Sequence, residues 1–490
     1  MKRLLASFHH LPAWLILTLI GVIILRVPSL FEPYYYGDEM IYLTLGQGLR
    51  NGLAFYRDLH DNKPPVLYLL AGLSGNLSLF KTLLAGWSLA TIVIYWQFLK
   101  KILKNSQVII VSTILFAVLT TIPLFEGNIA NAENFFIGPI ILSFSLLWSP
   151  VITTKKLFWA GFLFGLASLI KVPAAFDMLA VFAFWLITYG LNRKGVIKTI
   201  RQIIIFSIGF LLPVVVIFVY YTSIGAFSEY LIAAYLQNFG YVSSWKRSVV
   251  QESFLVKNWP LILRFLLAVI GAVGLYWQRK KLSPTFIFTC LWLLFSLFAV
   301  TLSERPYPHY FLQAVPAVAI LLGYLVADKT KLQTLSIIPL SLAFLVPVVF
   351  RFWYYPTSTY YTRFLAFATR QINYTGYLKS FDSNLPNFYQ IATYLNQETT
   401  RRDKIFVWGD APVVYALSQR QPPIKYVAGY HINDFYTWTE TLKDLRVQVP
   451  KMIILDTHSS HLEIVSFLKE RYGFVTQFGD WQIWKLITKK

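Results

Sequence analysis

A succession of long apolar segments constrains the fold of this chain more than any other feature of its sequence. A helix needs about 20 mostly apolar residues to cross the hydrocarbon core of a bilayer. Of the 490 residues, 56% are hydrophobic and 14% are charged, whereas globular domains carry roughly 25% charged residues. Apolar windows of suitable length fall near residues 11–30, 81–99, 107–125, 134–150, 157–172, 174–191, 200–222, 260–277, 284–302, 309–326 and 332–353. The sequence therefore predicts an all-α multi-span membrane bundle of about eleven transmembrane helices.

The charges between these windows predict an orientation. The N-terminus and alternate gaps hold 16 basic residues and one acid, Asp328; the basic residues are Lys2, Arg3, Lys100, Lys101, Lys104, Lys155, Lys156, Arg193, Lys194, Lys198, Arg201, Arg279, Lys280, Lys281, Lys329 and Lys331. Basic loops stay on the cytoplasmic side of a plasma or inner membrane, so we expect the N-terminus inside and, after an odd number of spans, the C-terminus outside. The net charge of +21 then has a topological cause, which argues against nucleic acid as a partner.

Two segments do not fit the regular spans. Val66–Phe80 is apolar but short, and a span there would invert the charge of every later gap, so we expect an interfacial or re-entrant helix within a first outer loop at 31–80. A transmembrane domain over 1–354 is expected to precede a small extracytoplasmic α/β domain over 355–490. In that domain, residues 403–429 predict strand, short helix and strand, and residues 450–487 predict strand, helix and two strands joined at Gly479 and Asp480.

Acidic residues concentrate in the first outer loop. Asp38 and Glu39 directly precede "MIYLTLGQGL", which has the apolar spacing of a short amphipathic helix. Asp38 could serve only as the cap of that helix, because Asp favours this position. A carboxylate at the outer membrane face is also placed to act as a general base on an acceptor hydroxyl. Both interpretations stay open.

Downstream in the same loop, "RDLHDNKPP" contains Asp61 and Lys63. A polar loop that ends at the two prolines would explain this composition without any further role. A lysine against the outer leaflet is, alternatively, suited to bind a lipid phosphate as a point charge.

Two later outer loops also carry charges. Glu133 follows the "EGNIAN" turn at the mouth of the helices, and carboxylates at membrane depth are functional by default, so we predict a hydrogen bond to a sugar or an acceptor. Lys171 lies at a tight turn, where it either neutralises Asp177 or contributes to a phosphate site.

Arg305 and His309 lie at the start of the window at 309–326. Arg305 suits a bidentate grip on phosphate, and His309 and Gln313, four residues apart, are expected to share a helix face. An aromatic belt with ordinary interface anchors is the alternative. No ligand spacing surrounds His309, and one cysteine, Cys290, excludes a multi-cysteine site. We therefore predict no metal site, although a divalent cation as cofactor is left open.

An ordered set of short motifs carries a resemblance to a known family. These motifs are "GDE" at 37–39 with Tyr42 and Gly52, "FYRDLHDNKPPVLYLLAGL", "AEN" at 132–134, "HYFLQAVP" at 309–316 and "IFVWGDAPVVYALSQRQPPIKY" at 405–426. The chain resembles the polyprenol-phosphate-sugar-dependent integral-membrane glycosyltransferases of the C-type fold. This group includes bacterial relatives of the protein O-mannosyltransferases and of the lipid A aminoarabinose transferase.

The resemblance implies an external active site that takes a sugar from a polyprenyl phosphate. Asp38 matches the acid of the first outer loop that is regarded as the base, with Glu39 in support. Lys63 matches the lysine before the family's proline and is assigned to the donor phosphate, with Asp61 beside it. Glu133 matches the acid of the second outer loop, and Lys171, Arg305 and His309 match more loosely as substrate-binding residues.

The favoured function is therefore inverting transfer of a hexosyl or pentosyl group from a polyprenyl-phosphate sugar to a hydroxyl of a glycan, lipid or protein acceptor. The alternative is a multi-span lipid or sugar transporter or flippase. A transporter is expected to carry paired broken helices or ionisable residues at mid-membrane, whereas the ionisable residues here gather at the predicted outer rim. A structural or sensory membrane protein with an external ligand-binding domain is a third alternative.

Overall fold

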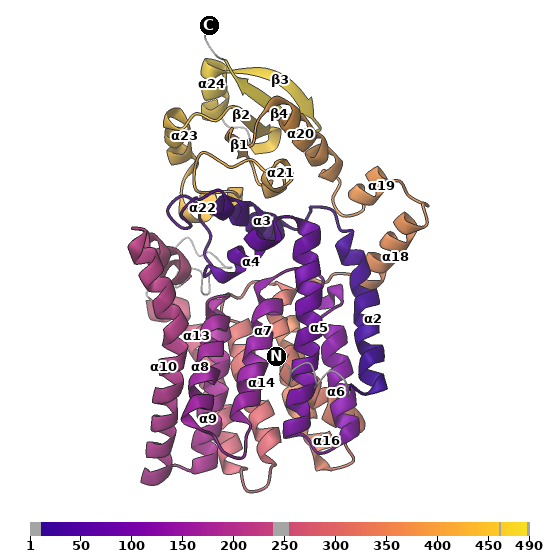
Figure 1. The fold of residues 1–490 in the computed structure, drawn as a ribbon, viewed down its shortest axis with the longest axis vertical. Helices are drawn as coiled ribbons and strands as arrows, with labels where there is room; N and C mark the ends of the chain where they lie inside the picture. Colours follow the sequence, from indigo (N-terminus) through magenta and orange to yellow (C-terminus); the bar gives the residue numbers. More distant parts are fainter. Residues whose placement is uncertain (1–10, 239–253, 460–461, 488–490) are drawn as a thin grey trace. The chain divides into compact units, whose positions relative to one another are not determined.

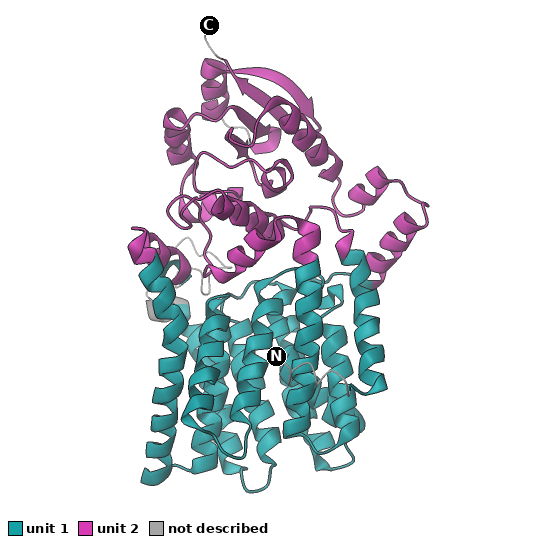
Figure 2. Cartoon of the chain, in the orientation of Figure 1, with its two compact units in different colours: residues 1–29, 82–220, 236–357 teal, residues 30–81, 221–235, 358–490 magenta. Residues whose placement is uncertain are grey.

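A computed structural model describes residues 11–238, 254–459 and 462–487. The chain divides into two compact units (Figure 2). Unit 1 comprises Met1–Ser29, Thr82–Tyr220 and Leu236–Thr357, and unit 2 comprises Leu30–Lys81, Tyr221–Tyr235 and Ser358–Lys490. The first outer loop, which the sequence grouped with the transmembrane domain, thus clusters with the C-terminal segment.

Unit 1 is a bundle of helices (Figure 1). Its helices are α2 (Ala13–Leu30), α5 (Leu77–Ile102), α6 (Ser106–Leu119), α7 (Ala132–Leu147), α8 (Thr154–Ser168), α9 (Met178–Tyr189), α10 (Arg193–Ser223), α13 (Phe254–Trp277), α14 (Pro284–Val300), α15 (Val315–Ala327), α16 (Lys331–Leu335) and α17 (Ile337–Val349). Short 3-10 helices η1 (Pro123–Phe125), η2 (Val172–Asp177) and η4 (Pro308–Gln313) precede α7, α9 and α15. Every predicted apolar window overlaps one of these helices.

Six helical stretches in the described part of the chain are long and apolar enough to cross a membrane: Ala13–Leu30, Leu77–Ile102, Val172–Tyr189, Arg193–Ser223, Asn258–Trp277 and Lys331–Val349. Four apolar helices are shorter, namely α6, α7, α14 and α15. The windows that predicted them run on into turns or 3-10 segments, as at 309–326, where η4 occupies the first residues. The multi-span membrane bundle is confirmed, while the number of eleven spans stays a prediction.

Small residues bring two helices of this bundle close together. A side chain at Gly165 of α8 would meet the Pro213 ring of α10 at 2.6 Å, and one at Gly161 would meet the Phe210 backbone at 3.0 Å. Small residues four apart on one face are a common device for close helix packing in membranes.

Cys290 is buried in α14, as expected for a small core residue.

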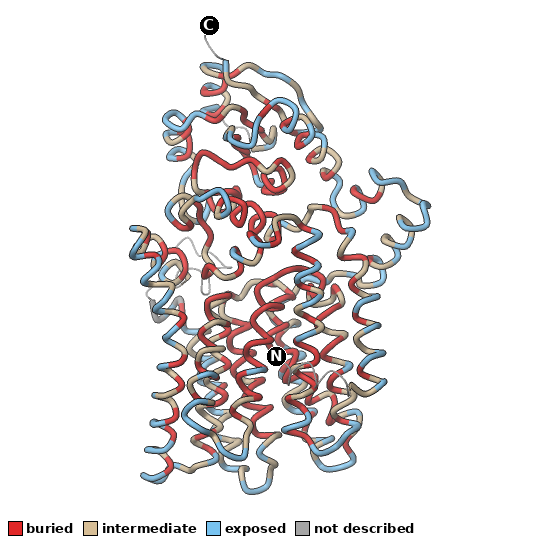
Figure 3. The backbone as a smooth tube through the Cα atoms, in the orientation of Figure 1, coloured by how far each residue is buried: buried red, intermediate tan, exposed pale blue. Residues whose placement is uncertain are grey.

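Two short helices, α3 (Gly37–Arg50) and α4 (Val66–Ser74), pack on each other in unit 2. α3 is buried along most of its length (Figure 3), and it also packs on α21 of the C-terminal domain. α4 has nine residues and is therefore about 14 Å long, less than half of a hydrocarbon core. The predicted single segment 66–80 divides at Gly75, whose φ of 77° ends α4, and its last residues begin α5.

The C-terminal part of unit 2 is an α/β domain, as predicted. Its helices are α18 (Thr357–Ala368), α19 (Tyr374–Lys379), α20 (Leu385–Glu398), α21 (Pro412–Ser418), α22 (Gly429–Phe435), α23 (Trp438–Val447) and α24 (Leu462–Arg471). Its strands are β1 (Ile405–Trp408), β2 (Met452–Asp456), β3 (Tyr472–Phe478) and β4 (Trp481–Leu486), in the order β1-β2-β4-β3. β1 and β2 are parallel, whereas β4 is antiparallel to both β2 and β3.

The second strand predicted within 403–429 is wrong. Residues 419–428 lie outside the regular elements, and the two prolines at 422 and 423 lack the N–H groups that a ladder requires. The Lys425 carbonyl accepts instead from the backbone N–H of His60, at 2.9 Å. The segment thus ties the first outer loop to the domain within unit 2. The hairpin at Gly479 and Asp480 is confirmed, with Gly479 at a φ of 56°.

Candidate functional site

The start of α3 determines where Asp38 lies. The helix begins at Gly37 after an extended Tyr36, whose side chain makes no capping bond. Asp38 and Glu39 therefore both lie in the first turn, and Asp38 is not the cap that the sequence allowed. Two acids in the first turn are still favourable, because the N-terminal end of a helix carries partial positive charge. The Tyr42 hydroxyl, one turn on, donates to Asp38 Oδ2 at 2.8 Å.

Lys63 lies between two carboxylates of the first outer loop. Its Nζ is 3.9 Å from Asp38 Oδ2 and 3.8 Å from Asp61 Oδ2, which is ion-pair distance but longer than a hydrogen bond. The ammonium also lies 5.1 Å from the centre of the Tyr42 ring. The Asp38 side chain is 28% exposed, and Lys63 is 17% exposed, so both can meet a ligand. The structure thus brings together three of the predicted residues: Asp38, Asp61 and Lys63.

Asp61 is the buried member of this group, with 1% of its side chain exposed. Burial raises the pKa of the Asp61 carboxyl, but Lys63, His431 and the Asn62 backbone N–H more than offset this, so the pKa lies below its usual value. His431 Nε2, from α22, is 3.6 Å from Asp61 Oδ1. Asp61 is therefore a buried negative charge next to Lys63, and its side chain is not accessible to a ligand.

Glu39 points into a different environment from Asp38. Lys81 Nζ is 2.8 Å from Glu39 Oε1 and 2.7 Å from Glu32 Oε2, and all three side chains are buried. Tyr360 donates its hydroxyl to Glu32. The predicted pair of catalytic acids is thus divided, since Glu39 belongs to a buried ion-pair triad. The sequence did not reveal this triad, although Lys81 at the first position of an apolar window was a clue.

A second group of charged side chains lies in unit 1, at the helix starts near η1, η2 and η4. Glu133, in the first turn of α7, forms an ion pair with Lys171. The Lys171 ammonium lies 4.0 Å from the centre of the Tyr310 ring. The ion pair of Lys171 with Glu133 was not among the alternatives that the sequence offered for this lysine.

Asp177 has its own set of partners. Trp292 Nε1 donates to it at 3.2 Å, Ser296 Oγ at 2.9 Å and Gln313 Nε2 at 2.9 Å. Gln313 also donates to the Pro173 carbonyl, at 3.0 Å. These bonds join η2, α14 and η4 and satisfy a carboxylate that is 1% exposed, so Asp177 serves the packing of the bundle.

His309 contacts Glu126 through Nδ1, and both side chains are buried. The imidazole stacks on Tyr307 with the ring centres 5.6 Å apart. His309 and Gln313 do not share a face as predicted, because η4 has the three-residue turn of a 3-10 helix, in which residues four apart diverge. Glu126 lies in the "EGNIAN" turn, and nothing in that motif pointed to a histidine 183 residues away.

Arg305 lies four residues before His309, in the loop between α14 and η4. Its backbone N–H donates to Ser303 Oγ at 3.4 Å. The adjacent Glu304, at a φ of 58°, pairs with Arg264 at 2.9 Å.

Within the described residues, no group of three or more His, Cys, Asp or Glu side chains could hold a metal ion. The two groups of charged side chains can therefore interact with a ligand through their charge. In unit 2, Asp38 and Lys63 are partly exposed, whereas the charged side chains near η1, η2 and η4 in unit 1 are largely buried.

Among the solved structures that match the chain are two of ArnT from Cupriavidus metallidurans. The structure bound to undecaprenyl phosphate covers 97% of this chain and 98% of its own, with a TM-score of 0.55 and 12% identity. The apo structure covers 96% and 97%, with a TM-score of 0.57 and 14% identity. The chain has the ArnT fold. No family model matches, and neither does any curated protein.

The ArnT fold extends over almost the full length of both chains, so it includes the bundle and the C-terminal domain together. The family resemblance inferred from short motifs is thereby confirmed at the level of the fold. With at most 14% identity, the shared fold leaves the roles of individual residues to the geometry of this chain.

Proposed function

We propose that this protein is a membrane glycosyltransferase that moves a sugar from a polyprenyl phosphate to an acceptor hydroxyl. The observation that carries the proposal is the partly exposed pair of Asp38 and Lys63, 3.9 Å apart, in a chain with the fold of a protein solved with undecaprenyl phosphate. A carboxylate and an ammonium group in reach of each other provide the base and the phosphate contact that this reaction needs.

The chemistry requires one base and no general acid. As the acceptor oxygen bonds to the anomeric carbon, the bond from that carbon to the phosphate oxygen breaks, and its electron pair stays on the phosphate. The acceptor proton passes to Asp38. A phosphate is a weakly basic leaving group, so cationic contacts suffice to stabilise it. A single displacement of this kind inverts the anomeric centre, whereas glycoside hydrolases usually need two carboxylates.

Lys63 is the residue we assign to the donor phosphate. Its ammonium is attracted from both sides by Asp38 and Asp61, each just beyond hydrogen-bond distance. A phosphate at this partly exposed ammonium would accept a charge-assisted hydrogen bond from it. Asp61 holds Lys63 in place, and the Tyr42 hydroxyl on Asp38 orients the base. Glu39, which pairs with Lys81, lies in the same first turn of α3 as Asp38 and stabilises that turn.

For the charged group of unit 1, the substrate-binding roles predicted from the sequence for Glu133, Lys171, Arg305 and His309 stay predictions. The alternation of basic gaps supports an outer-face location in a plasma or inner membrane for the active residues and for the C-terminal domain.

Substitution of the base tests the assignment. Asp38→Asn keeps the size of the side chain and its bond to Tyr42 but cannot accept a proton at neutral pH, so we expect sugar transfer by the purified protein to fall by about 100-fold or more. The matched control is Asp58→Asn, because Asp58 lies in the same loop and pairs with the exposed Arg57 at 3.0 Å. Near-wild-type transfer by Asp38→Asn would remove Asp38 from the role of base.

A second variant tests the phosphate contact. Lys63→Met keeps most of the apolar stem but loses the charge, and we expect weaker binding of a polyprenyl phosphate that carries no sugar, by about tenfold. Lys425→Met is the control, since Lys425 is another cation of unit 2 that lies over an aromatic ring, 5.3 Å from the centre of Tyr426. Equal lipid affinity in the wild type and in Lys63→Met would contradict the assignment.

A further inference from the structure

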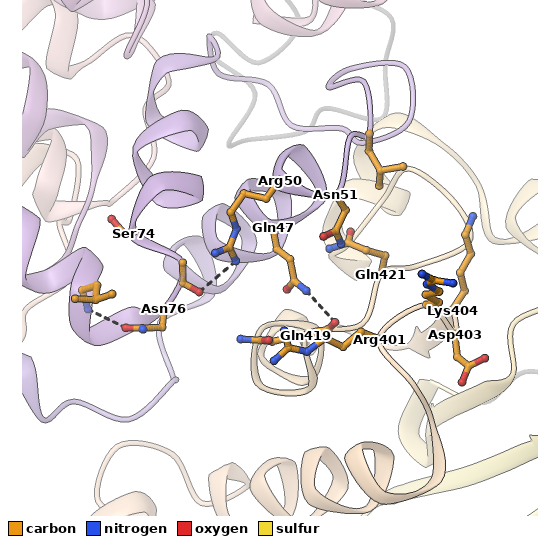
Figure 4. A pocket seen from close by; sticks show the side chains of 14 residues that line it. Gln47, Arg50, Asn51, Ser74, Asn76, Arg401, Asp403, Lys404, Gln419 and Gln421 are labelled. Atoms are coloured by element: carbon orange, nitrogen blue, oxygen red, sulfur yellow. Dashed lines mark hydrogen bonds between the residues drawn. The ribbon is translucent and has the colours of Figure 1, made fainter.

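A polar pocket lies within unit 2, away from Asp38. It has a volume of about 850 Å³ and is lined by the end of α3, the turn after α4, the segment before β1 and the segment after α21 (Figure 4). From Asp38 to Arg50, which lines the pocket, α3 runs for twelve residues, or about 18 Å. A small substrate at Asp38 therefore cannot fill this pocket as well.

The lining is strongly basic. Arg50, Arg401, Arg402 and Lys404 contribute four positive charges. The carboxylate in the lining, Asp403, already forms an ion pair with Lys451 at 2.8 Å. A cavity walled by cations concentrates anionic ligands and raises their rate of association, so the pocket favours a ligand with at least one negative group.

The pocket also holds a buried hydrogen-bond acceptor with no partner. Gln421 is 7% exposed and lines the pocket. Its Nε2 donates to the Thr44 carbonyl at 3.1 Å, which fixes the orientation of the amide and leaves Oε1 without a hydrogen bond. A buried acceptor costs about 1–3 kcal/mol when it stays unpaired, so the wall of the pocket contains an unsatisfied polar group.

Further amides line the same cavity beside these charges. Gln47, Asn51 and Asn76 contribute side-chain amides, and the Gln47 amide is held by a bond to the Gln419 carbonyl at 2.9 Å (Figure 4). Fixed amides with cations suit a ligand that combines many hydroxyls with acidic groups. An acidic carbohydrate has this chemistry, because it presents hydroxyl donors and acceptors together with carboxylate or phosphate oxygens.

We propose that this pocket binds an acidic segment of a carbohydrate acceptor and so holds an extended chain whose reacting hydroxyl lies elsewhere. That the ligand is the acceptor rests on the proposed transferase function; that the pocket binds an acidic carbohydrate does not. The acceptor is then an anionic glycan and not a small neutral alcohol.

Direct binding tests the pocket without any transfer reaction. The probe is an oligogalacturonate, a uronic-acid oligosaccharide, titrated into the full-length protein in detergent, with a neutral malto-oligosaccharide of equal length as the comparison. We expect the acidic probe to bind at least tenfold more tightly than the neutral one, and its affinity to fall as the salt concentration rises.

Variants with matched loss of charge locate the binding. Arg401→Ser combined with Arg402→Ser is expected to weaken the acidic probe by about tenfold. Lys443→Ser combined with Lys469→Ser removes the same charge from exposed positions on α23 and α24, outside the lining, and is expected to leave affinity unchanged. Gln421→Met is expected to weaken binding about threefold without changing its dependence on salt.

Equal binding of the two probes, or equal effects of the two double variants, would overturn the proposal. Release of sugar from the lipid donor, measured for the same variants in native membranes that supply the acceptor, separates the two claims. Loss of probe binding with donor turnover intact supports the pocket, and absence of donor turnover in every protein, the wild type included, would contradict the transferase function alone.

Discussion

At the scale of single residues, Asp38 and Glu39 are neighbours in sequence with different surroundings. Asp38 keeps 28% of its side chain exposed beside Lys63, whereas Glu39 is fully buried against Lys81. Successive residues of a helix point about 100° apart, so one side chain of an adjacent pair reaches solvent while the other reaches the core. Only the exposed member can meet an acceptor hydroxyl.

The sequence predicted the residues of the first-loop site better than their separate roles. Asp38, Asp61 and Lys63 were chosen together and do lie together. His431, which contacts Asp61, and Lys81, which pairs with Glu39, come from segments that are distant in the sequence. Contacts between residues so far apart leave no local sequence pattern.

The buried triad predicts a large loss of stability when its cation is removed. Lys81→Met leaves Glu32 and Glu39 buried without their shared ammonium, so we expect a loss of about 3–5 kcal/mol, measured as a lowered midpoint of thermal unfolding in detergent. Lys469→Met, at an exposed position of α24, is the control and should change little. The triple variant Lys81→Met, Glu32→Gln, Glu39→Gln also lacks both carboxylates. If its unfolding midpoint were no higher than that of Lys81→Met alone, repulsion between the two carboxylates would not be the cause of the lost stability.

His60 predicts a specific dependence of stability on pH. Burial, followed by the nearby His431, lowers the pKa of His60 from 6.5 to about 3. Between these values the unfolded chain binds a proton that the folded chain does not. The free energy of unfolding is therefore unaffected by the protonation of His60 above pH 6.5. It decreases as the pH falls from 6.5 toward 3, by up to about 1.4 kcal/mol per pH unit.

His60→Phe should remove this contribution, because Phe can keep the edge contacts with Tyr426 and Phe435 but cannot titrate. The unfolding midpoint, compared at pH 7.5 and pH 4.5, should fall less in this variant than in the wild type. His458→Phe, at a histidine with 74% of its side chain exposed, should keep the wild-type difference. If the unfolding midpoint of His60→Phe fell between pH 7.5 and pH 4.5 as much as that of the wild type, His60 would not be the source of this pH dependence.

At the scale of elements, the position of Asp38 depends on the close approach of α3 and α4. A side chain at Gly46 would meet Gly72 of α4 at 2.8 Å from its Cα. Glycine at position 46 allows the two backbones to lie this near, and a side chain at Gly72 would meet the Gly46 carbonyl oxygen at 3.0 Å. The apolar spacing after Asp38 predicted α3, but the crossing could not be predicted, since it depends on two glycines in separate helices.

The 3-10 helices were the least predictable elements. The window at 309–326 has the apolar composition of one helix, but Pro308 and Pro316 bracket a 3-10 turn before α15. In this turn His309 contacts Glu126 and Gln313 donates to Asp177. The prediction that His309 and Gln313 share a helix face was therefore wrong.

The crossing of α3 and α4 predicts the effect of one added methyl group. Gly46→Ala should separate the two helices and destabilise the protein by about 1–3 kcal/mol, despite the higher helix propensity of Ala. Gly37→Ala is the matched control on the same helix, because a side chain there would meet nothing within 4 Å. Thermal unfolding of both variants checks the prediction, and equal midpoints would refute the importance of the crossing.

At the scale of the whole molecule, apolar succession was the most reliable guide. The sequence predicted a multi-span bundle with a small α/β domain, and the structure contains both. Grouping of the first outer loop with the C-terminal segment was not predictable from composition, because it rests on packing between α3 and α21 and on the bond from His60 to Lys425.

The central claim is transfer of a sugar from a polyprenyl phosphate, and the fate of a doubly labelled donor tests it most directly. The protein is assayed in native membranes, which supply the acceptor, with a polyprenyl-phosphate sugar that carries one label on the sugar and another on the lipid. We expect the sugar label to leave the lipid in the wild type and to stay on it in Asp38→Asn. Movement of the intact donor across the bilayer, with both labels still joined, would contradict the account and favour a flippase.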